Sequence, residues 1–253
     1  MKRLIAFLFV LTSFTSASAL EKSMLSLKLP SRLEARQAQF FFQHRFYGRI
    51  DKDALDTFFG MSQGANAGLG FRVRLFENFE MAVFHVFLNN EYSLVAGYAV
   101  DLPSLPLRAQ VDAEIFTDKK LIFLKDRVDF TRKRFAALRL DLASKPILNR
   151  LTPAVNIGYD TEMERTGLGF GLDAAISKKF SLIGEYYPRL KKNGPDDDLR
   201  YDSYAVGLKV QTYGHHFLFH VGNNTQIGIR RLMAGSASRD LYFGFGIQRL
   251  LEF

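Results

Sequence analysis

The last thirteen residues of the chain alternate apolar side chains with small or polar ones. One face of this segment carries Leu241, Phe243, Phe245 and Ile247, and the other carries Tyr242, Gly244, Gly246 and Gln248. A period of two is the pattern of a β-strand. About 9–11 tilted strand residues suffice to cross the hydrocarbon of a membrane. Because lipid cannot satisfy open backbone edges, a membrane-crossing strand predicts a closed, antiparallel transmembrane β-barrel.

The same alternation recurs between turn signals in about twelve segments of the chain. The predicted strands cover residues 36–46, 67–76, 80–88, 91–100, 106–116, 134–142, 152–160, 167–177, 180–188, 202–212, 215–222 and 241–251. Two further stretches, 120–130 and 225–233, alternate in part, and they either extend hairpins or form extra strands. The sequence therefore predicts an all-β barrel of about twelve strands and leaves fourteen open.

The connections between the predicted strands sort by length. If Phe253 ends in the periplasm, the connections on the outside are 47–66, 89–90, 117–133, 161–166, 189–201 and 223–240. Those on the periplasmic side are 77–79, 101–105, 143–151, 178–179 and 213–214. Nearly all long connections fall in the outer set, which is typical of outer-membrane barrels.

The amino-terminal residues have the order of a secretory signal peptide. Lys2 and Arg3 precede an apolar run over 4–11, and Ala17-Ser18-Ala19 forms an A-x-A site. A retained membrane anchor is disfavoured, because a spanning helix needs about 20 apolar residues. We expect residues 1–19 to be a cleaved signal peptide, 20–34 a short periplasmic lead-in and 35–253 the barrel, located in the outer membrane of a Gram-negative bacterium.

The amino-acid composition limits the kinds of molecule that the chain is expected to bind. The absence of cysteine excludes disulfides and lipoprotein acylation. The formal charge is +8, and Lys and Arg outnumber acids between Lys119 and Arg134. An exported chain is not expected to meet nucleic acid, so this basic stretch either faces anionic outer-membrane lipid or is a solvated loop. With 10 Tyr, 25 Phe and no Trp, Tyr and Phe must form the aromatic girdles at the two membrane interfaces.

Several sequence blocks resemble a known family. They are Gln43-His44-Arg45-Phe46-Tyr47-Gly48-Arg49-Ile50, Phe58-Phe59-Gly60-Met61, residues 65–70, residues 214–223 and residues 241–249. These blocks are similar to the opening and the last two strands of an uncharacterised family of β-barrel outer-membrane proteins of unknown function. The resemblance implies a fold and a cellular address, and no activity.

The lumen-facing positions of the predicted strands carry charges of both signs. They are Arg72, Arg74, Arg108, Asp112, Glu114, Arg139, Asp141, Asp173, Glu185 and Lys209. Separated clusters would create a field across a pore, whereas interdigitated pairs would fill the interior. Inward glycines leave room on one wall and favour a cavity; they are Gly167, Gly169, Gly171, Gly244 and Gly246.

Three motifs suggest other chemistry. His216 and His220 share a strand face, but four strand residues span roughly 13 Å, too far for one metal ion. The run Asp196-Asp197-Asp198 lacks the spacing of an EF-hand loop, so a solvated turn is favoured over a calcium site. His44 with Arg45 near the outer rim leaves a lipase- or protease-type barrel enzyme as an alternative.

The leading hypothesis is an outer-membrane barrel acting as a narrow solute channel or as a structural or binding barrel. We assign no catalytic residue, cofactor or metal. The final strand, with Ile247, Leu251 and Phe253, is expected to be recognised by the barrel-assembly machinery, and Arg249 interrupts its apolar series.

Overall fold

The computed structural model describes residues 23–30, 33–52, 54–123, 128–190 and 199–253. The expected signal peptide and the run Asp196-Asp197-Asp198 lie outside the described residues. Over the part of the chain that is described, no helix is both long enough and apolar enough to cross a membrane.

Twelve strands make up most of the described chain. They are β1 (Gln37–Arg49), β2 (Ala65–Phe76), β3 (Phe79–Val86), β4 (Glu91–Leu102), β5 (Leu107–Phe123), β6 (Val128–Ser144), β7 (Leu151–Asp160), β8 (Arg165–Ala175), β9 (Phe180–Tyr187), β10 (Ser203–Thr212), β11 (His215–Gly222) and β12 (Tyr242–Glu252). Three short helices lie between them: η1 (Met61–Gln63), η2 (Leu88–Asn90) and α2 (Ile229–Ala234). Each predicted strand corresponds to one observed strand, so the prediction of twelve strands is confirmed.

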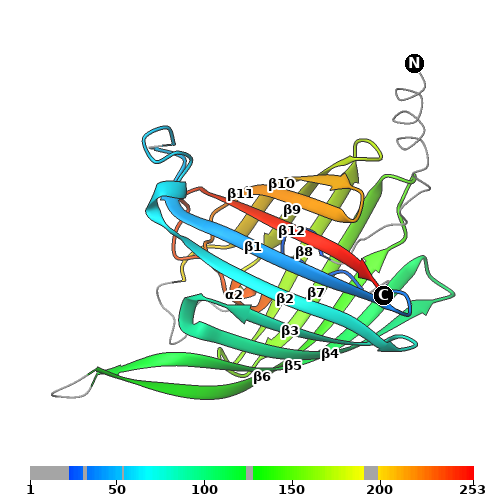
Figure 1. The fold of residues 1–253 in the computed structure, drawn as a ribbon, viewed down its shortest axis with the longest axis horizontal. Helices are drawn as coiled ribbons and strands as arrows, with labels where there is room; N and C mark the ends of the chain where they lie inside the picture. The colour runs from blue at the N-terminus through cyan, green and yellow to red at the C-terminus, as the bar shows by residue number, and fades with distance from the viewer. Residues whose placement is uncertain (1–22, 31–32, 53, 124–127, 191–198) are drawn as a thin grey trace, which may run out of the picture.

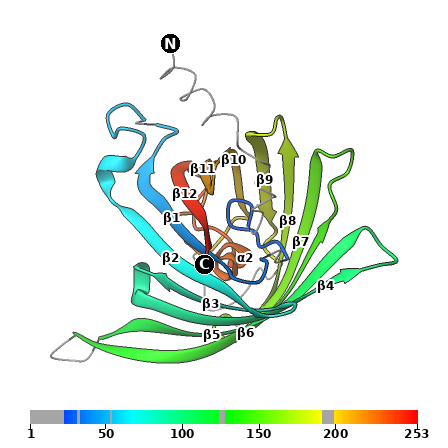
Figure 2. The same cartoon turned by 45° about the vertical axis from the view of Figure 1, so that its right-hand side comes forward.

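The strands form one closed antiparallel barrel (Figures 1 and 2). Each strand pairs with the next along the chain, and β12 pairs with β1, from Gln37 opposite Glu252 to Arg45 opposite Gly244. The end of the chain is also tied to its partner strand, because the Phe253 N–H donates to the Arg36 carbonyl at 3.1 Å. Closure satisfies the backbone groups that an open sheet would expose to lipid.

The two stretches that alternate only in part, 120–130 and 225–233, have different structures. The described residues of the stretch 120–130, namely 120–123 and 128–130, extend the strands of the β5–β6 hairpin. Their pairing continues to Phe123 opposite Val128, and the hairpin projects beyond the neighbouring strands in Figure 1. The stretch 225–233 forms no strand, because β11 and β12 pair directly with each other and leave it no edge. It enters the lumen and contributes α2 instead, between Gly228 and Gly235, both with positive φ. Fourteen strands are therefore excluded within the described chain.

The two rims of the barrel differ in the length of their connections. One end, here called the loop rim, carries the connections 50–64, 87–90, 161–164, 188–202 and 223–241 and the tip of the β5–β6 hairpin. The other end, the turn rim, carries 77–78, 103–106, 145–150, 176–179 and 213–214. The three longest connections, 50–64, 188–202 and 223–241, all lie at the loop rim, as predicted, whereas the predicted long connection 117–133 is mostly strand.

The outer surface of the barrel is apolar and carries aromatic residues near the loop rim. Tyr92, Tyr159, Tyr186 and Tyr204 lie at the loop-rim ends of four strands and are 38–49% exposed. Amphipathic rings at that height match the position of lipid headgroups. The interior, by contrast, contains most of the buried charged side chains, and it is there that a functional site has to be sought.

Candidate functional site

The structure places all ten predicted lumen charges on the inner side of the barrel wall. Arg74 and Arg108 lie near the turn rim and are partly exposed. The other eight are at most 9% exposed: Arg72, Asp112, Glu114, Arg139, Asp141, Asp173, Glu185 and Lys209. A charge so well shielded from bulk water requires a partner of opposite sign or hydrogen bonds from polar groups.

These charges are interdigitated and not separated by sign. Arg139 forms ion pairs with Asp112 and Asp141, the latter at 2.8 Å, and Lys209 pairs with Asp173. Arg72 lies 3.3 Å from Glu80. Two bonded residues, Glu80 and Gln110, were not among the predicted site residues: Gln110 Nε2 donates to Glu80 Oε1 at 2.8 Å and to Asp112 Oδ1 at 2.5 Å. The wall from β2 to β6 is thus linked by one polar network.

Residues 23–30, the N-terminal plug, occupy the lumen (Figure 2). The backbone N–H groups of Ser26 and Leu27 both donate to Glu185 Oε1, at 2.8 and 2.9 Å. Asn156 holds the backbone of Lys28 in both directions, accepting from its N–H at 2.8 Å and donating to its carbonyl at 2.9 Å. The expected lead-in outside the barrel is therefore, over its described residues 23–30, a segment bound inside it.

The apolar side chains of the N-terminal plug pack against glycines of the wall. Met24 and Leu27 are 0% exposed. A Cβ at Gly171 would overlap the sulfur of Met24, and one at Gly169 would come within 3.4 Å of Leu27. The expectation that the inward glycines leave an open cavity is wrong at these positions, because the space they leave is filled by plug side chains.

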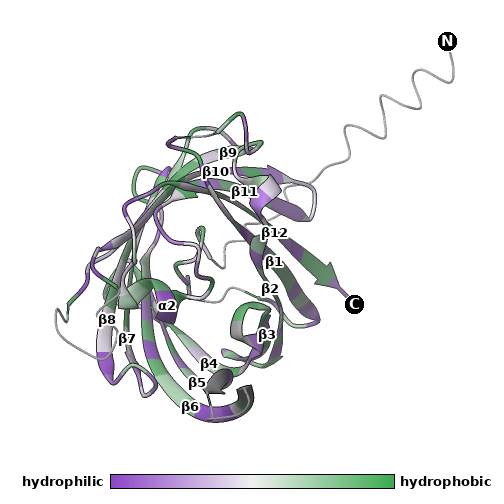
Figure 3. Cartoon of the chain, turned by 90° about the vertical axis from the view of Figure 1, so that its left-hand side faces the viewer, coloured by the Kyte–Doolittle hydropathy of each residue, from purple (hydrophilic) through white to green (hydrophobic). Residues whose placement is uncertain are grey.

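The second internal segment, the α2 plug, comprises residues 225–235 and enters from the loop rim. Figure 3 shows α2 inside the ring of strands. Ile227 packs against Gly68, and Met233 packs against Gly167. Arg165 Nη1 donates to the carbonyl of Ala234 at 3.1 Å, so the end of α2 is tied to β8.

Two adjacent arginines of α2, here called the arginine latch, bind carboxylates of the barrel wall and its loops. Arg230 contacts Asp160 at 2.8 Å, Glu114 at 3.5 Å, Glu162 at 3.7 Å and also Glu91. Arg231 contacts Asp118 at 2.9 Å, Glu91 at 3.0 Å and Glu162 at 3.2 Å. The Arg230 guanidinium also lies 3.4 Å from the centroid of the Phe116 ring, a cation–π geometry.

The latch is electrostatically robust. Burial disfavours the charged form of Arg230, but the attraction of Glu114, Glu91 and Asp160 outweighs it and raises the pKa of Arg230 above its usual value. Because the pKa of Arg230 is raised, its stabilisation of the docked α2 is complete at every pH below the ordinary arginine pKa. This stabilisation is lost only at pH values above the ordinary pKa. The latch arginines therefore stay charged at every physiological pH, and acid can weaken the latch only through its carboxylates.

The sequence analysis did not identify the latch, because it treated 223–240 as an outer connection whose part 225–233 either extends a hairpin or forms an extra strand. A usable signal existed: the adjacent Arg230 and Arg231 lie in a long connection, while Glu91 and Asp160 stand at strand ends on the same side of the barrel. Opposite charges assigned to one rim predict ion pairs between the loop and the wall.

Between the two plugs a cavity of about 40 Å³ is left near the middle of the barrel. Its charged lining consists of Lys28, Arg72, Arg139 and Arg230 together with Glu91 and Glu114. About 10–15 Å³ of such volume holds one water molecule, so the cavity has room for a few waters and for no larger solute. Among the described residues, the two plugs fill the middle of the lumen, and a wider pocket of about 450 Å³ lies at the turn rim beside Arg74 and Arg108.

The histidine motifs do not form a reactive site. His44 points outward, stacks on Phe46 and Phe245 with centroids 5.9 and 5.0 Å apart, and its Nδ1 has no hydrogen-bond partner. No serine or carboxylate partner of His44 is found among the described residues, so the enzyme alternative loses the arrangement that motivated it. His220 is buried in the lumen, 2.6 Å from Arg45 Nη1 through Nε2. The described residues contain no group of three His, Cys, Asp or Glu that could hold a metal ion.

The geometry defines a membrane β-barrel with an internally plugged, charged lumen. A family model described as "Membrane bound beta barrel domain (DUF5777)" matches residues 117–251, just over half of the chain, and the chain belongs to this family. The predicted resemblance to an uncharacterised barrel family is confirmed. No curated protein matches.

Solved structures with a similar fold include porins. The KdgM porin is 12% identical with a TM-score of 0.52, covering 84% of this chain and 98% of that one. The KdgM porin in complex with disordered oligogalacturonate is 12% identical with a TM-score of 0.53, and the match covers 83% of this chain and 98% of that one. The NanC porin is 8% identical with a TM-score of 0.50, and the match covers 84% of this chain and 98% of that one. At these identities the likeness shows the fold.

Proposed function

We propose that this protein is a gated solute channel of the Gram-negative outer membrane, with the loop rim outside and the turn rim in the periplasm. The observation that carries the proposal is the kind of closure. The lumen is filled by two plugs that are held by hydrogen bonds, ion pairs and packing, against a wall whose side chains are compatible with water.

A charged wall is a poor choice for a barrel that is permanently closed. Replacing a buried ion pair by well-packed apolar residues is often neutral or stabilising. Ion pairs such as Arg139–Asp112 and Lys209–Asp173 bring no clear gain in stability if they never meet water. They are suited to a lumen that becomes hydrated when a plug moves, which is the behaviour of a gated channel.

The charges around the central cavity are balanced. Arg72 pairs with Glu80, Arg139 pairs with Asp112 and Asp141, and Arg230 pairs with several carboxylates. A hydrated wall that carries paired charges of both signs suits a polar or charged solute. The KdgM porin, a barrel of similar fold, has been solved in complex with disordered oligogalacturonate. This supports a charged solute without identifying it.

The α2 plug is the proposed gate. It is part of the connection between β11 and β12, so the 223–241 loop can swing out of the loop rim while the twelve barrel strands stay paired; only the β-bridge between Ser236 and Tyr201 has to open. Its opening requires the arginine latch to exchange wall carboxylates for water. The N-terminal plug packs against β8 and β10 through Leu27 and Leu25 and stays in place, so we propose that the solute passes through the part of the lumen that α2 vacates.

A reversible lock on the α2 plug tests the proposal. A Cβ at Gly68 would lie 3.0 Å from Ile227 Cγ2, which places the two Cβ atoms within about one bond length of the ~3.8 Å spacing of a disulfide. The natural chain has no cysteine, so a Gly68→Cys/Ile227→Cys pair would be the sole pair of thiols. Ile227→Cys alone is the matched control, and a folded barrel is verified by its heat-dependent migration on gels.

Flux of small anions and cations into proteoliposomes is then measured for the oxidised and the reduced double variant. We expect the reduced protein to pass small ions, and oxidation to abolish the flux reversibly while leaving the control unchanged. Equal flux in both redox states would refute α2 as the gate. No flux from the wild type or from either state of the variant would refute the channel in favour of a structural barrel.

Assembly of the barrel is proposed to depend on its last strand. Leu251 lies near the end of β12, which closes the barrel against β1, and Phe253 directly follows this strand. We propose that this strand is the segment presented to the barrel-assembly machinery.

A further inference from the structure

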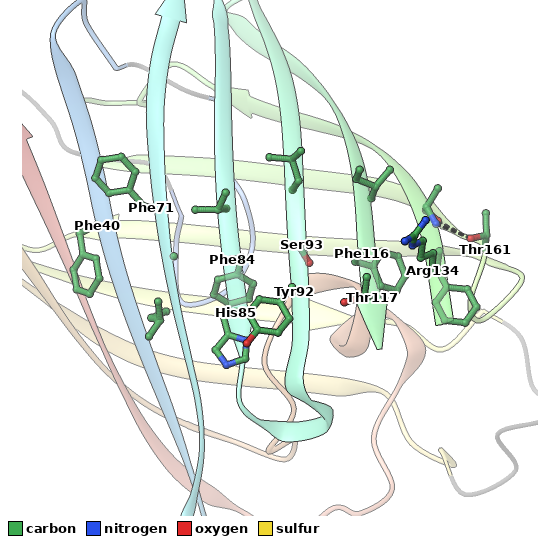
Figure 4. Close-up of a pocket in the computed structure, with 17 residues that line it drawn as sticks. Phe40, Phe71, Phe84, His85, Tyr92, Ser93, Phe116, Thr117, Arg134 and Thr161 are labelled. Carbon is green, nitrogen blue, oxygen red and sulfur yellow. Dashed lines mark hydrogen bonds between the residues drawn. The ribbon is translucent and has the colours of Figure 1, made fainter. Parts of the chain in front are cut away.

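The outer surface of β2–β6 is hollowed near the loop rim. This depression, the rim groove, has a volume of about 870 Å³, within the range of roughly 300–1,000 Å³ that is usual for small-molecule pockets. Figure 4 shows side chains that line it, with His85 and Tyr92 close together and Arg134 farther along. The groove lies on the membrane-facing side of the wall and is separate from the plugged lumen.

The strand register orders the outward side chains of the groove into rows. The deeper row runs Phe71, Val83, Leu94, Ile115 and Ala136, each paired with the next across β2–β6. It is wholly apolar, and Val83 and Ile115 are 52% and 61% exposed. Such a row fits hydrocarbon.

The next row toward the loop rim is amphipathic. It runs Leu69, His85, Tyr92, Thr117 and Arg134 in the same register. The His85 and Tyr92 rings stack with centroids 4.2 Å apart. One further step along β5 and β6, Lys119 pairs in register with Arg132. Successive rows are two residues apart, or roughly 7 Å, so the surface changes from apolar to cationic over about 13 Å.

The cations at the upper end are held in place. Arg132 Nη1 donates to Thr117 Oγ1 at 2.8 Å and to the Asn90 carbonyl at 3.2 Å, and its guanidinium lies 5.3 Å from the Tyr92 centroid. Lys119 Nζ lies 3.8 Å from the centroid of Phe130. Because Arg132 makes its hydrogen bonds to described residues through Nη1 alone, the other donors of its guanidinium are available to an oxyanion.

We propose that the rim groove binds a phosphorylated lipid with several acyl chains from the outer leaflet of the membrane. The acyl chains lie along the row from Phe71 to Ala136, and the headgroup phosphate meets Arg132, Arg134 and Lys119. The change from hydrocarbon to cations over about 13 Å matches the passage from acyl chains into the headgroup region. Charge complementarity selects this occupant over a second copy of the barrel, which would bring the same cations. The assignment to the outer leaflet rests on the proposed orientation of the loop rim.

Native mass spectrometry of the full chain in detergent tests the proposal. The probes are bisphosphorylated lipid A and its dephosphorylated form. We expect the wild type to bind the phosphorylated probe at least tenfold more tightly, with a preference that falls as salt rises. Arg132→Gln/Arg134→Gln should abolish the preference, and Ala136→Phe, which fills the groove, should weaken binding of both probes. Arg249→Gln, which removes an exposed cation of β12, is the matched control and should bind like the wild type.

Three outcomes would overturn the proposal. These are equal binding of the two probes by the wild type, unchanged binding by the double arginine variant, and a dimer that disappears in the Ala136→Phe variant. The last result would assign the groove to contacts between two copies of the chain. All variants retain the central part of the lumen, so loss of lipid binding with normal ion flux separates this proposal from that of the channel.

Discussion

Removing one arginine of the latch should open the channel. In the closed structure Arg230 is 8% exposed and lies among Glu91, Glu114, Asp160 and Glu162. In Arg230→Gln, docking of α2 would still bury these carboxylates but would no longer supply their main cation. With α2 undocked they are hydrated in both proteins. The substitution therefore destabilises the docked state relative to the undocked state.

The size of the effect follows from the contacts. Breaking a buried ion pair by removing one partner costs about 3–5 kcal/mol. Arg231 still contacts Glu91, Asp118 and Glu162, so the lower end of this range applies. About 3 kcal/mol corresponds to roughly a hundredfold change in an equilibrium constant. The ratio of open to closed channels should rise by about two orders of magnitude.

Single-channel recording in planar bilayers measures this ratio. We expect rare openings in the wild type and long or permanent openings in Arg230→Gln, with the same conductance per opening as in the wild type. Arg249→Gln, a charge-matched change on the exposed face of β12, should behave like the wild type. An open probability for Arg230→Gln within a factor of about three of the wild type would refute the role of the latch, since that factor corresponds to less than about 1 kcal/mol.

Three further perturbations test other parts of the structure. Glu185→Ala removes the acceptor of two backbone N–H groups of the N-terminal plug, and each unsatisfied buried donor costs about 1–3 kcal/mol. Limited proteolysis should therefore cut residues 23–30 faster than in the wild type. An unchanged rate would contradict the role of Glu185. Burial and the nearby Arg72 and Arg139 lower the pKa of Lys28 to about 7. Between about pH 7 and the ordinary lysine pKa, Lys28 is protonated when the N-terminal plug is released and largely neutral when it is docked. The plug should therefore dock more tightly, and be cut more slowly by protease, as the pH rises through this range. Lys28→Met should remove this pH dependence of the proteolysis rate. Deleting Phe253 should lower the amount of assembled barrel in cells without changing the migration of the fraction that folds, and full assembly would argue against recognition of the last strand.

The strand set could be predicted from the sequence because a barrel wall imposes one simple rule. Each strand faces lipid on one side and the lumen on the other, so the period of two recurs along the whole chain. The rule also separates the faces: Asp112 and Val111 fall on opposite sides of β5, buried and exposed respectively. Loop lengths then follow from the direction of each strand.

The two plugs could not be predicted, because their positions depend on tertiary contacts without a local pattern. Residues 23–30 are too short and irregular to suggest an element, and their place inside the barrel depends on Glu185 and Asn156, which are more than a hundred residues away in the chain. The glycines of β8 indicated space but not its occupant. The side chains of Met24 and Met233 fill that space from segments that were assigned to a lead-in and to a possible strand.

The ion pairs between the lumen charges also could not be predicted from the sequence. The sequence supplied the nearly balanced signs, but whether Arg139 meets Asp112 or faces a pore depends on the register between β5 and β6. In the structure Asp112 lies directly opposite Arg139 in that register. A shift by one residue would have turned one of the two side chains toward lipid.

Hydrogen–deuterium exchange of the protein in lipid nanodiscs is the most direct test of a lumen filled from within. Because the amides of Ser26 and Leu27 donate to Glu185 inside the barrel, they should exchange much more slowly than amides of the exposed 50–64 loop, and Glu185→Ala should make them exchange fast. Immediate exchange of these two amides in the wild type would place residues 23–30 outside the barrel and refute the plugged lumen.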